Sequence, residues 1–406
     1  MKPPPRILVV GALTVALYAA FFAARLQRYD SNVTAFVGFG CHVSVCWAEE
    51  NREFLPPAAV VFPSGGYDGQ FYYYIAAGFY RAQPVRLDAP PLRYSRIGYP
   101  LLVAPFHAGG PLALVFALLL VPLIAHLLAL YVLDRTYAGQ GMSSFAVVFA
   151  LALFALNPLS LFSFGLALAD GLALALGLLG CIAYRNRPTF AGRVLAFVLI
   201  AFACLTKETM LALPLGFGVA ALLRRDWRGS FVLFGTLVPV VLFWYAIDFS
   251  PGMAADRGGL PFAGLVEFIL AGRGLAGGRG LLVILLFVYV GVGLSLFLHA
   301  VREPFWRSGS DSRGQVGALE LAGVLGATTA LVSFATADEY WANFANISRF
   351  FIPGCLALCL LPLVVPGRSA RWTGGGVCAF LLLFTLSLLY AELRAEPLGF
   401  ILMDPR

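Results

Sequence analysis

Residues 111–133 read PLALVFALLLVPLIAHLLALYVL, a stretch that contains no Asp, Glu, Lys or Arg. A helix needs about 20 consecutive apolar residues to cross the hydrocarbon core of a bilayer, so this segment is long enough to span. Similar stretches recur along the 406 residues, of which 60% are apolar and 12% charged, and the mean hydropathy is +0.84. This composition lies outside that of soluble domains and predicts an all-α polytopic membrane protein.

The apolar stretches on either side of this segment predict about 11 transmembrane helices within one membrane domain, residues 1–406. The first follows Lys2 and Arg6, as in a signal peptide, but no small-residue cleavage site follows it, which favours a retained helix. The expected spans are 7–24, 111–133, 143–161, 166–184, two short helices within 194–223, 230–248, 280–300, 319–334, 349–366 and 373–391.

Basic residues mark the loops that are expected in the cytoplasm, as in 185–187 and 224–228. The N terminus is then cytoplasmic, and two long extracytoplasmic loops follow, 25–100 and 249–279, the second with an apolar part that is expected to lie along the membrane interface. The net charge of +7 is spread over short loops instead of one face. No nucleic-acid partner is therefore predicted.

The first long loop contains GYDGQFYYY, residues 66–74, in which one carboxylate stands among five aromatic rings. Asp68 either forms a tight turn with its glycine neighbours or begins an interfacial helix whose aromatic face lies in the headgroup layer. On the second interpretation Asp68 is the catalytic candidate, and burial near apolar rings is expected to raise its pKa and make it a stronger base. Tyr67, Gln70 and Tyr72 would then line the substrate cleft or support it.

Four cations are candidates for binding a phosphate group, because guanidinium and ammonium groups pair with phosphate oxygens. Arg93 and Arg96 flank Tyr94, another cleft candidate, in LRYSRIGYP, residues 92–100. Lys207 and Arg349 are the other two. For the arginines, the alternative is anchoring at the headgroup boundary without a specific ligand.

Lys207 and Glu208 interrupt an apolar stretch, where an unpaired charge costs roughly 2.5–3.5 kcal/mol. They either pair with each other, or Lys207 contacts a phosphate while Glu208 orients it. Asp170, a carboxylate within an apolar run, supports the site or pairs with Lys207. The topology brings Asp68, Lys207, Glu208 and Arg349 to one membrane face, together with Asp338 and Glu339.

Cysteine and histidine residues contribute little to the expected chemistry. Cys41 and Cys46 fall in the first long loop, where an oxidising compartment favours a disulfide, while the other five cysteines fall in apolar runs. The histidines offer no metal-ligand pair. No cofactor or dedicated metal site is predicted, and dependence on a divalent metal stays open.

Four motifs resemble those of uncharacterised bacterial members of the GT-C superfamily of integral membrane glycosyltransferases. They are YDGQFY at 67–72, RYSRIGYPLL at 93–102, LTKET at 205–209 and NISR at 346–349, and the resemblance covers residues 1 to 360. It implies a bacterial inner-membrane enzyme, a sugar donor on a polyprenyl phosphate and an acid of the first outer loop as general base. Asp68 matches that acid, with Asp30 as the alternative because it lies nearer the first helix.

The resemblance therefore implies transfer of a sugar from a polyprenyl-phosphate donor to an acceptor hydroxyl at the extracytoplasmic face. The donor phosphate would be bound by Lys207, Arg349, Arg93 and Arg96, and membrane lipids would surround the helices. The acceptor is a glycan, a lipid or a protein. Two other classes stay open: a secondary transporter, in which an internal repeat is expected, and a non-catalytic membrane subunit of an envelope assembly.

Overall fold

A computed structural model describes the chain over residues 5–42, 45–63, 65–80, 84–139, 144–186, 189–248, 261–270, 278–302, 317–334 and 347–364, with isolated positions between 379 and 387. These residues are mostly helical. The expected helix at 373–391 lies largely outside the described residues, as do Asp338, Glu339 and most of the loop 249–279.

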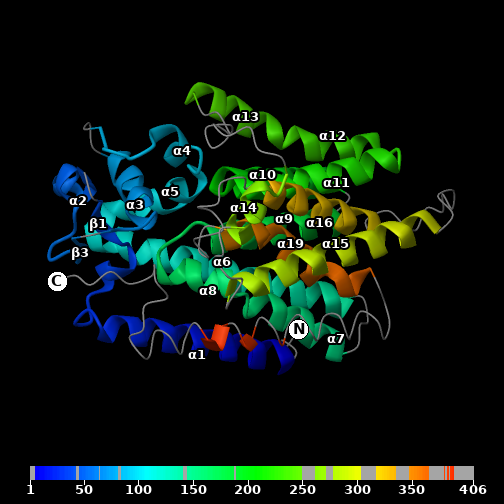
Figure 1. The fold of residues 1–406 in the computed structure, drawn as a ribbon, viewed down its shortest axis with the longest axis horizontal. Coiled ribbons are helices and arrows are strands. Elements are labelled where there is room, and N and C mark those ends of the chain that lie inside the picture. The colour runs from blue at the N-terminus through cyan, green and yellow to red at the C-terminus, as the bar shows by residue number, and fades with distance from the viewer. Residues whose placement is uncertain are drawn as a thin grey trace.

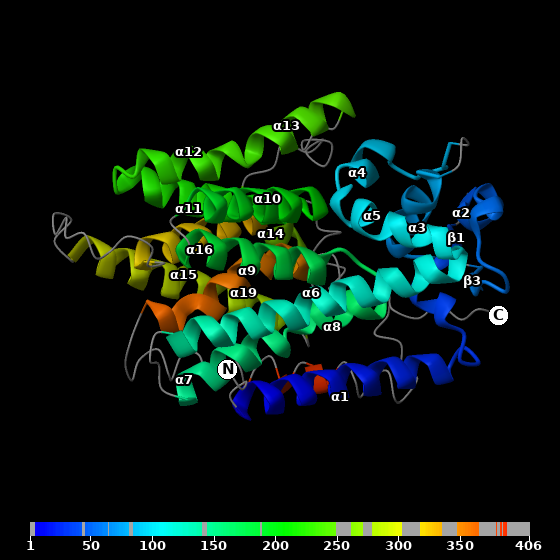
Figure 2. The ribbon, with the colours of Figure 1, turned by 180° about the vertical axis from the view of Figure 1, so that it is seen from behind.

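The long helices lie side by side and form a bundle (Figure 1). Helix α1 lies along one long side of the bundle, and α12 and α13 lie along the opposite side (Figure 2). The bundle helices are α1 (Pro5–Gln27), α6 (Pro111–Gly139), α7 (Ser144–Ala155), α8 (Pro158–Gly165), α9 (Asp170–Asn186), α10 (Phe190–Thr206), α11 (Ala212–Leu223), α12 (Trp227–Gly235), α13 (Leu237–Ala246), α14 (Ala263–Leu270), α15 (Gly278–Arg302), α16 (Ala318–Ser333) and α19 (Ile352–Leu360).

Four helical stretches in the described part of the chain are long and apolar enough to cross a membrane: 6–27, 111–139, 227–246 and 282–300. Their outer sides carry exposed apolar side chains, such as Ile124, Leu242 and Phe287, which are 62%, 62% and 71% exposed. Exposed side chains of this kind suit contact with lipid. The other apolar helices are shorter, so the structure supports a helical membrane protein but not the count of 11 spans.

Two expected spans differ in detail from the observed helices. The span 143–161 is interrupted, because α7 ends at Ala155 and α8 begins at Pro158. Proline cannot donate the backbone hydrogen bond that a continuous helix needs, but it is favoured in the first turn of a new helix. The span 349–366 begins with a 3₁₀ turn, η7 (Arg349–Phe351), and its regular structure ends with η8 (Leu361–Leu363).

The first long loop folds into a compact unit at one end of the bundle, called here the first-loop unit (residues 33–109) (Figure 1). Its three-stranded sheet has the order β2-β1-β3, with β1 (Phe39–His42) antiparallel to β2 (Val45–Cys46) and parallel to β3 (Val61–Phe62). Its helices are α2 (Trp47–Glu50), α3 (Gly69–Gly78), α4 (Pro90–Tyr94), α5 (Gly98–Val103) and the 3₁₀ helices η1 (Val33–Phe36), η2 (Arg52–Phe54) and η3 (Ala104–Gly109). The all-α expectation missed this small sheet.

The expected interfacial position of α3 is wrong. Phe71, Tyr72, Tyr73 and Tyr74 are at most 4% exposed and belong to a protein core that α3 shares with α5 and α6. Four consecutive aromatic side chains point to all sides of a short helix, and each of them packs against other parts of the protein. The aromatic residues therefore fix α3 within the first-loop unit instead of holding it in lipid headgroups.

Candidate functional site

Asp68 is the residue before α3, yet its side chain makes no capping hydrogen bond to that helix. Its carboxylate instead accepts hydrogen bonds from three guanidinium groups. The donor-to-acceptor distances are 2.7 Å from Arg93 Nη1, 2.8 Å from Arg349 Nη1 and 3.4 Å from Arg96 Nη1. Three cations from distant parts of the sequence thus meet one carboxylate, which is 19% exposed.

Arg93 is held by a second carboxylate that the sequence analysis missed. Its Nε and Nη2 atoms donate to the two oxygens of Asp88 at 2.7 and 2.6 Å, a bidentate pair. Its guanidinium group also lies 4.3 Å from the ring centroid of Phe71, a cation–π contact. Asp88 lies five residues before Arg93, across Pro90 and Pro91, and this proximity was the available signal.

Arg96 joins the first-loop unit to the bundle. Its Nε and Nη2 atoms donate to Glu208 at 2.9 and 2.8 Å, and Lys207 Nζ lies 3.0 Å from the same carboxylate. Lys207 and Glu208 therefore pair with each other, and Glu208 also binds Arg96. Lys207 is only 3% exposed, and the Glu208 carboxylate compensates its charge inside the protein.

Close packing of α5 on the end of α10 makes this contact possible. A Cβ atom at Gly98 would lie 2.5 Å from Thr206 Oγ1 and 2.9 Å from the Thr206 backbone nitrogen, so no larger residue fits without a shift. Thr206 ends α10, directly before Lys207. Gly98 therefore lets the chain segment that carries Arg96 approach the turn that carries Glu208.

Arg349 connects Asp68 to Asp170, the first residue of α9. Its Nε lies 2.9 and 3.1 Å from the two Asp170 oxygens, and Asp170 is 2% exposed. Asp170 thus pairs with Arg349 and not with Lys207, the partner considered from the sequence. Within the described residues, Arg349 Nη2 is buried and has no hydrogen-bond partner.

The eight charged residues form one connected cluster, called here the Asp68 network: Asp68, Asp88, Asp170, Glu208, Arg93, Arg96, Lys207 and Arg349. Four carboxylates face four cations, so the formal charges cancel. Burying charges is costly unless each one is paired and hydrogen-bonded, and here every member has an oppositely charged partner. The network lies where the first-loop unit meets the bundle.

The expectation that Asp68 is a stronger base is wrong for this state. Burial by itself raises the pKa of Asp68, but Arg93, Arg349 and Arg96 together outweigh it and bring the pKa well below the usual value. Asp68 is therefore ionised at neutral pH and weakly basic as long as the three guanidinium groups face it.

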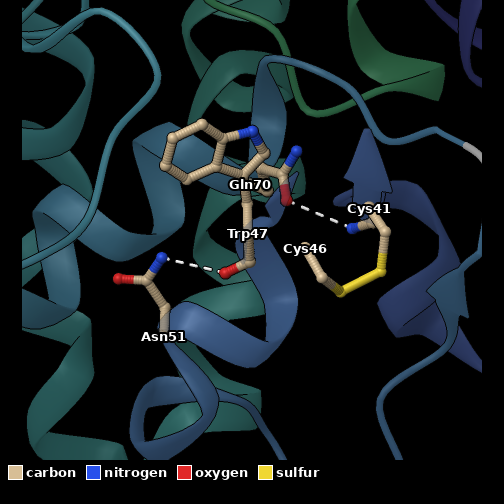
Figure 3. The surroundings of a disulfide bond; sticks show 6 residues. Cys41, Cys46, Trp47, Asn51 and Gln70 are labelled. Atoms are coloured by element: carbon tan, nitrogen blue, oxygen red, sulfur yellow. Dashed lines mark hydrogen bonds between the residues drawn. A yellow bond between two sulfur atoms is a disulfide. The ribbon is translucent and has the colours of Figure 1, made fainter. Parts of the chain in front are cut away.

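Two other candidates, Gln70 and Asp30, lie outside the Asp68 network, and only Gln70 supports it. Gln70 Oε1 accepts a hydrogen bond from the Gly40 backbone nitrogen at 3.1 Å, which fastens α3 to β1 beside the disulfide of Cys41 and Cys46 (Figure 3). Gln70 therefore positions α3. Asp30, the alternative acid, is exposed and takes no part in the network.

The three tyrosines occupy different depths around the Asp68 network. Tyr72 is fully buried, with its ring centroid 5.3 Å from that of Tyr99. Tyr67 interacts electrostatically with Arg349 and Asp68, and Tyr94 is half-buried against the core of the first-loop unit. Tyr72 and Tyr67 are therefore near the charged groups, whereas Tyr94 has a packing role.

Within the described residues, no group of three or more His, Cys, Asp and Glu side chains is arranged to hold a metal ion. Comparison of the chain with models of known protein families, with curated proteins and with solved structures found no match.

Proposed function

We propose that this protein is a membrane glycosyltransferase of the GT-C type, which transfers a sugar from a polyprenyl phosphate to an acceptor hydroxyl at the extracytoplasmic face. The observation that carries the proposal is the convergence of Arg93, Arg96 and Arg349 on the Asp68 carboxylate. Three guanidinium groups around one anion match the donors that a phosphate group needs, next to a carboxylate able to accept a proton.

The Asp68 carboxylate accepts hydrogen bonds from the same guanidinium groups that would bind the donor phosphate. A phosphodiester carries one negative charge, so it can replace the carboxylate as the partner of the guanidinium groups. Arg349 Nη2, which lacks a hydrogen-bond partner among the described residues, supplies an additional donor. Donor binding thus prepares the phosphate for departure and releases Asp68 from its cations.

Once released, Asp68 becomes a stronger base, because the three guanidinium groups are what lower its pKa. It takes the proton of the acceptor hydroxyl while that oxygen bonds to the anomeric carbon. The bond from that carbon to the phosphate oxygen breaks, and its electron pair leaves with the prenyl phosphate. Arg349 and one of Arg93 or Arg96 stabilise the negative charge that grows on the phosphate.

Each remaining member of the Asp68 network keeps a cation in place. Asp88 orients Arg93 and Glu208 orients Arg96, each through a bidentate pair of hydrogen bonds. Asp170 orients Arg349, whose Nε contacts both carboxylate oxygens. Lys207 balances the charge of Glu208, so its expected contact with phosphate gives way to this supporting role. Fixed cations cost no reorganisation when the phosphate arrives.

Two substitutions separate the base from the phosphate-binding group. Asp68→Asn removes the base but leaves the guanidinium groups free for phosphate, so we expect transfer to fall about 10²–10⁴-fold while donor binding is kept or strengthened. Arg349→Lys keeps a positive charge beside Asp170. An ammonium group cannot make the bidentate hydrogen bonds of a guanidinium group, so donor binding is expected to weaken.

The experiment measures the polyprenyl-phosphate sugar that co-purifies with each variant, by mass spectrometry, and sugar transfer in proteoliposomes that contain the same lipid. Asp30→Asn is the matched control and is expected to behave as the unaltered protein. Transfer retained by Asp68→Asn would exclude Asp68 as the base. A bound sugar lipid in neither the unaltered protein nor the Asp68→Asn variant would contradict the proposed donor.

A further inference from the structure

A groove of about 710 Å³ lies between α10 and α12. The N-terminal turns of these helices lie toward the end of the bundle opposite the first-loop unit (Figure 1). Both helices begin there, at Phe190 and Trp227. The groove is lined by residues from the first turns of the two helices, and the Asp68 network contributes none of them. We call it the α10–α12 groove.

Helical spacing sets apolar side chains on both walls. Phe190, Val194 and Val198 follow one another at intervals of four on α10, as do Trp227 and Phe231 on α12. Residues four apart lie on the same helix face. Phe190, Trp227 and Phe231 are 84%, 67% and 82% exposed, so the walls offer apolar surface to a partner.

Two cations line the same groove, Arg193 from α10 and Arg228 from α12. Neither has an ion pair or a side-chain hydrogen bond within the described part of the chain. Asp226, the acid nearest to Arg228 in sequence, caps α12 by accepting a hydrogen bond from the Gly229 backbone nitrogen at 3.0 Å. Positive helix dipoles at the two N-terminal ends add to the charge of the arginines.

We propose that the α10–α12 groove binds an anionic phospholipid. Its phosphate would pair with Arg193 and Arg228, and an acyl chain would lie along Val194, Val198 and Phe231. An apolar helix of another protein is a poorer occupant, because it would bury two cations without partners. The positive-inside pattern assigns this end of the bundle to the cytoplasmic leaflet, where anionic lipids attract basic side chains.

The test is native mass spectrometry of the full chain in a neutral detergent, titrated with phosphatidylglycerol or with phosphatidylcholine of the same acyl chains. We expect the unaltered protein to prefer phosphatidylglycerol. Each cation near an anionic lipid contributes about a fivefold change in affinity, so the double variant Arg193→Gln/Arg228→Gln is expected to bind phosphatidylglycerol about 30-fold more weakly. Its affinity for phosphatidylcholine should not change.

Arg135→Gln is the matched control, because Arg135 belongs to the cytoplasmic end of α6 in the predicted topology, contacts Tyr131 and does not line the groove. It should keep the lipid preference. Equal binding of both lipids by the unaltered protein would overturn the proposal, as would an unchanged preference in the double variant or an equal loss in Arg135→Gln. None of these outcomes depends on sugar transfer, so the glycosyltransferase proposal is tested separately.

Discussion

The cations at the two ends of the bundle differ in whether a carboxylate pairs with them. In the Asp68 network, four cations are buried and each contacts a carboxylate. In the α10–α12 groove, Arg193 and Arg228 line an apolar cleft without a carboxylate partner in the described residues. Buried cations need fixed partners, whereas cations near the membrane surface are stabilised by water and headgroups.

If both proposals hold, this difference separates two ways of binding an anion. A ligand of the Asp68 network must compete with carboxylates that are already present, which favours a ligand with the right shape and several acceptor oxygens. A ligand of the groove meets cations that are open to solvent, so affinity there depends mainly on charge and apolar area. Substitutions at the two ends of the bundle test this difference.

Removal of Arg349 should have the largest effect on stability. Arg349→Met leaves Asp170, which is 2% exposed, without its cation, and breaking a buried ion pair costs about 3–5 kcal/mol. Unfolding by denaturant in detergent micelles measures the loss. The double variant Arg349→Met/Asp170→Leu should recover most of it, because no unpaired charge is left. A double variant as unstable as the single one would show that packing, and not charge pairing, is lost.

Glu208→Gln is expected to cost about 2–3 kcal/mol, because it removes one carboxylate that two cations share. Lys207 is then a buried ammonium group without a negative partner. Replacing it as well, in Lys207→Met/Glu208→Gln, should restore part of the stability. Thermal unfolding of the two variants in the same detergent measures the difference, and equal melting temperatures would contradict the coupling.

Asp68→Asn should lower stability by about 2 kcal/mol at neutral pH, because the partly exposed carboxylate makes charged hydrogen bonds to three arginines. The pKa of Asp68 is lower in the folded protein than in the unfolded chain, so the stability from its ionised form is present above about pH 4 and is lost as pH falls further. Melting curves of the unaltered protein and the variant should therefore converge below pH 4. Curves that stay equally separated at pH 3 would show that the charge of Asp68 is not the cause.

The α10–α12 groove should show the smallest effect. In a neutral detergent, Arg193→Gln/Arg228→Gln is expected to change the free energy of unfolding by less than about 0.5 kcal/mol, as for surface substitutions that break no contact. The same unfolding measurement applies. A loss comparable to that of Arg349→Met would mean that the two arginines have partners within the protein, and the contrast between the two ends would fail.

The helices were predictable because their signal is local. Apolar runs such as 111–133 and 280–300 correspond to α6 and α15, since each stretch is apolar enough whatever its neighbours do. The break between α7 and α8 falls at Asn157 and Pro158, inside the expected span 143–161, although a proline inside an apolar run is a local signal for such a break. The small sheet was missed because β1 and β3 are short and pair across many intervening residues.

Most charged residues of the Asp68 network were predictable from the sequence, but most of the ion pairs between them were not. Asp68 and Arg349 were expected on one face, Arg96 was expected among the phosphate-binding cations, and the structure brings both arginines into contact with Asp68. The pair of Lys207 and Glu208 was one of two alternatives and is observed, whereas the pairing of Asp170 with Arg349 and the part of Asp88 were missed. A charged residue in an apolar run must have a partner, but the sequence does not say which of several acids is near enough.

A helical membrane protein with an acid and several cations in its polar segments follows from the sequence alone, because hydropathy and charge belong to single residues and their neighbours. The tertiary structure alone decided how those charges combine. Arg349 and Asp170 are 179 residues apart, and Arg96 and Glu208 are 112 apart, so only the packing of η7 near α9, and of α5 near the end of α10, brings them together. Electrostatic attraction falls with distance through space, and for the same reason only the fold could show that Asp68, surrounded by arginines, is a weak base.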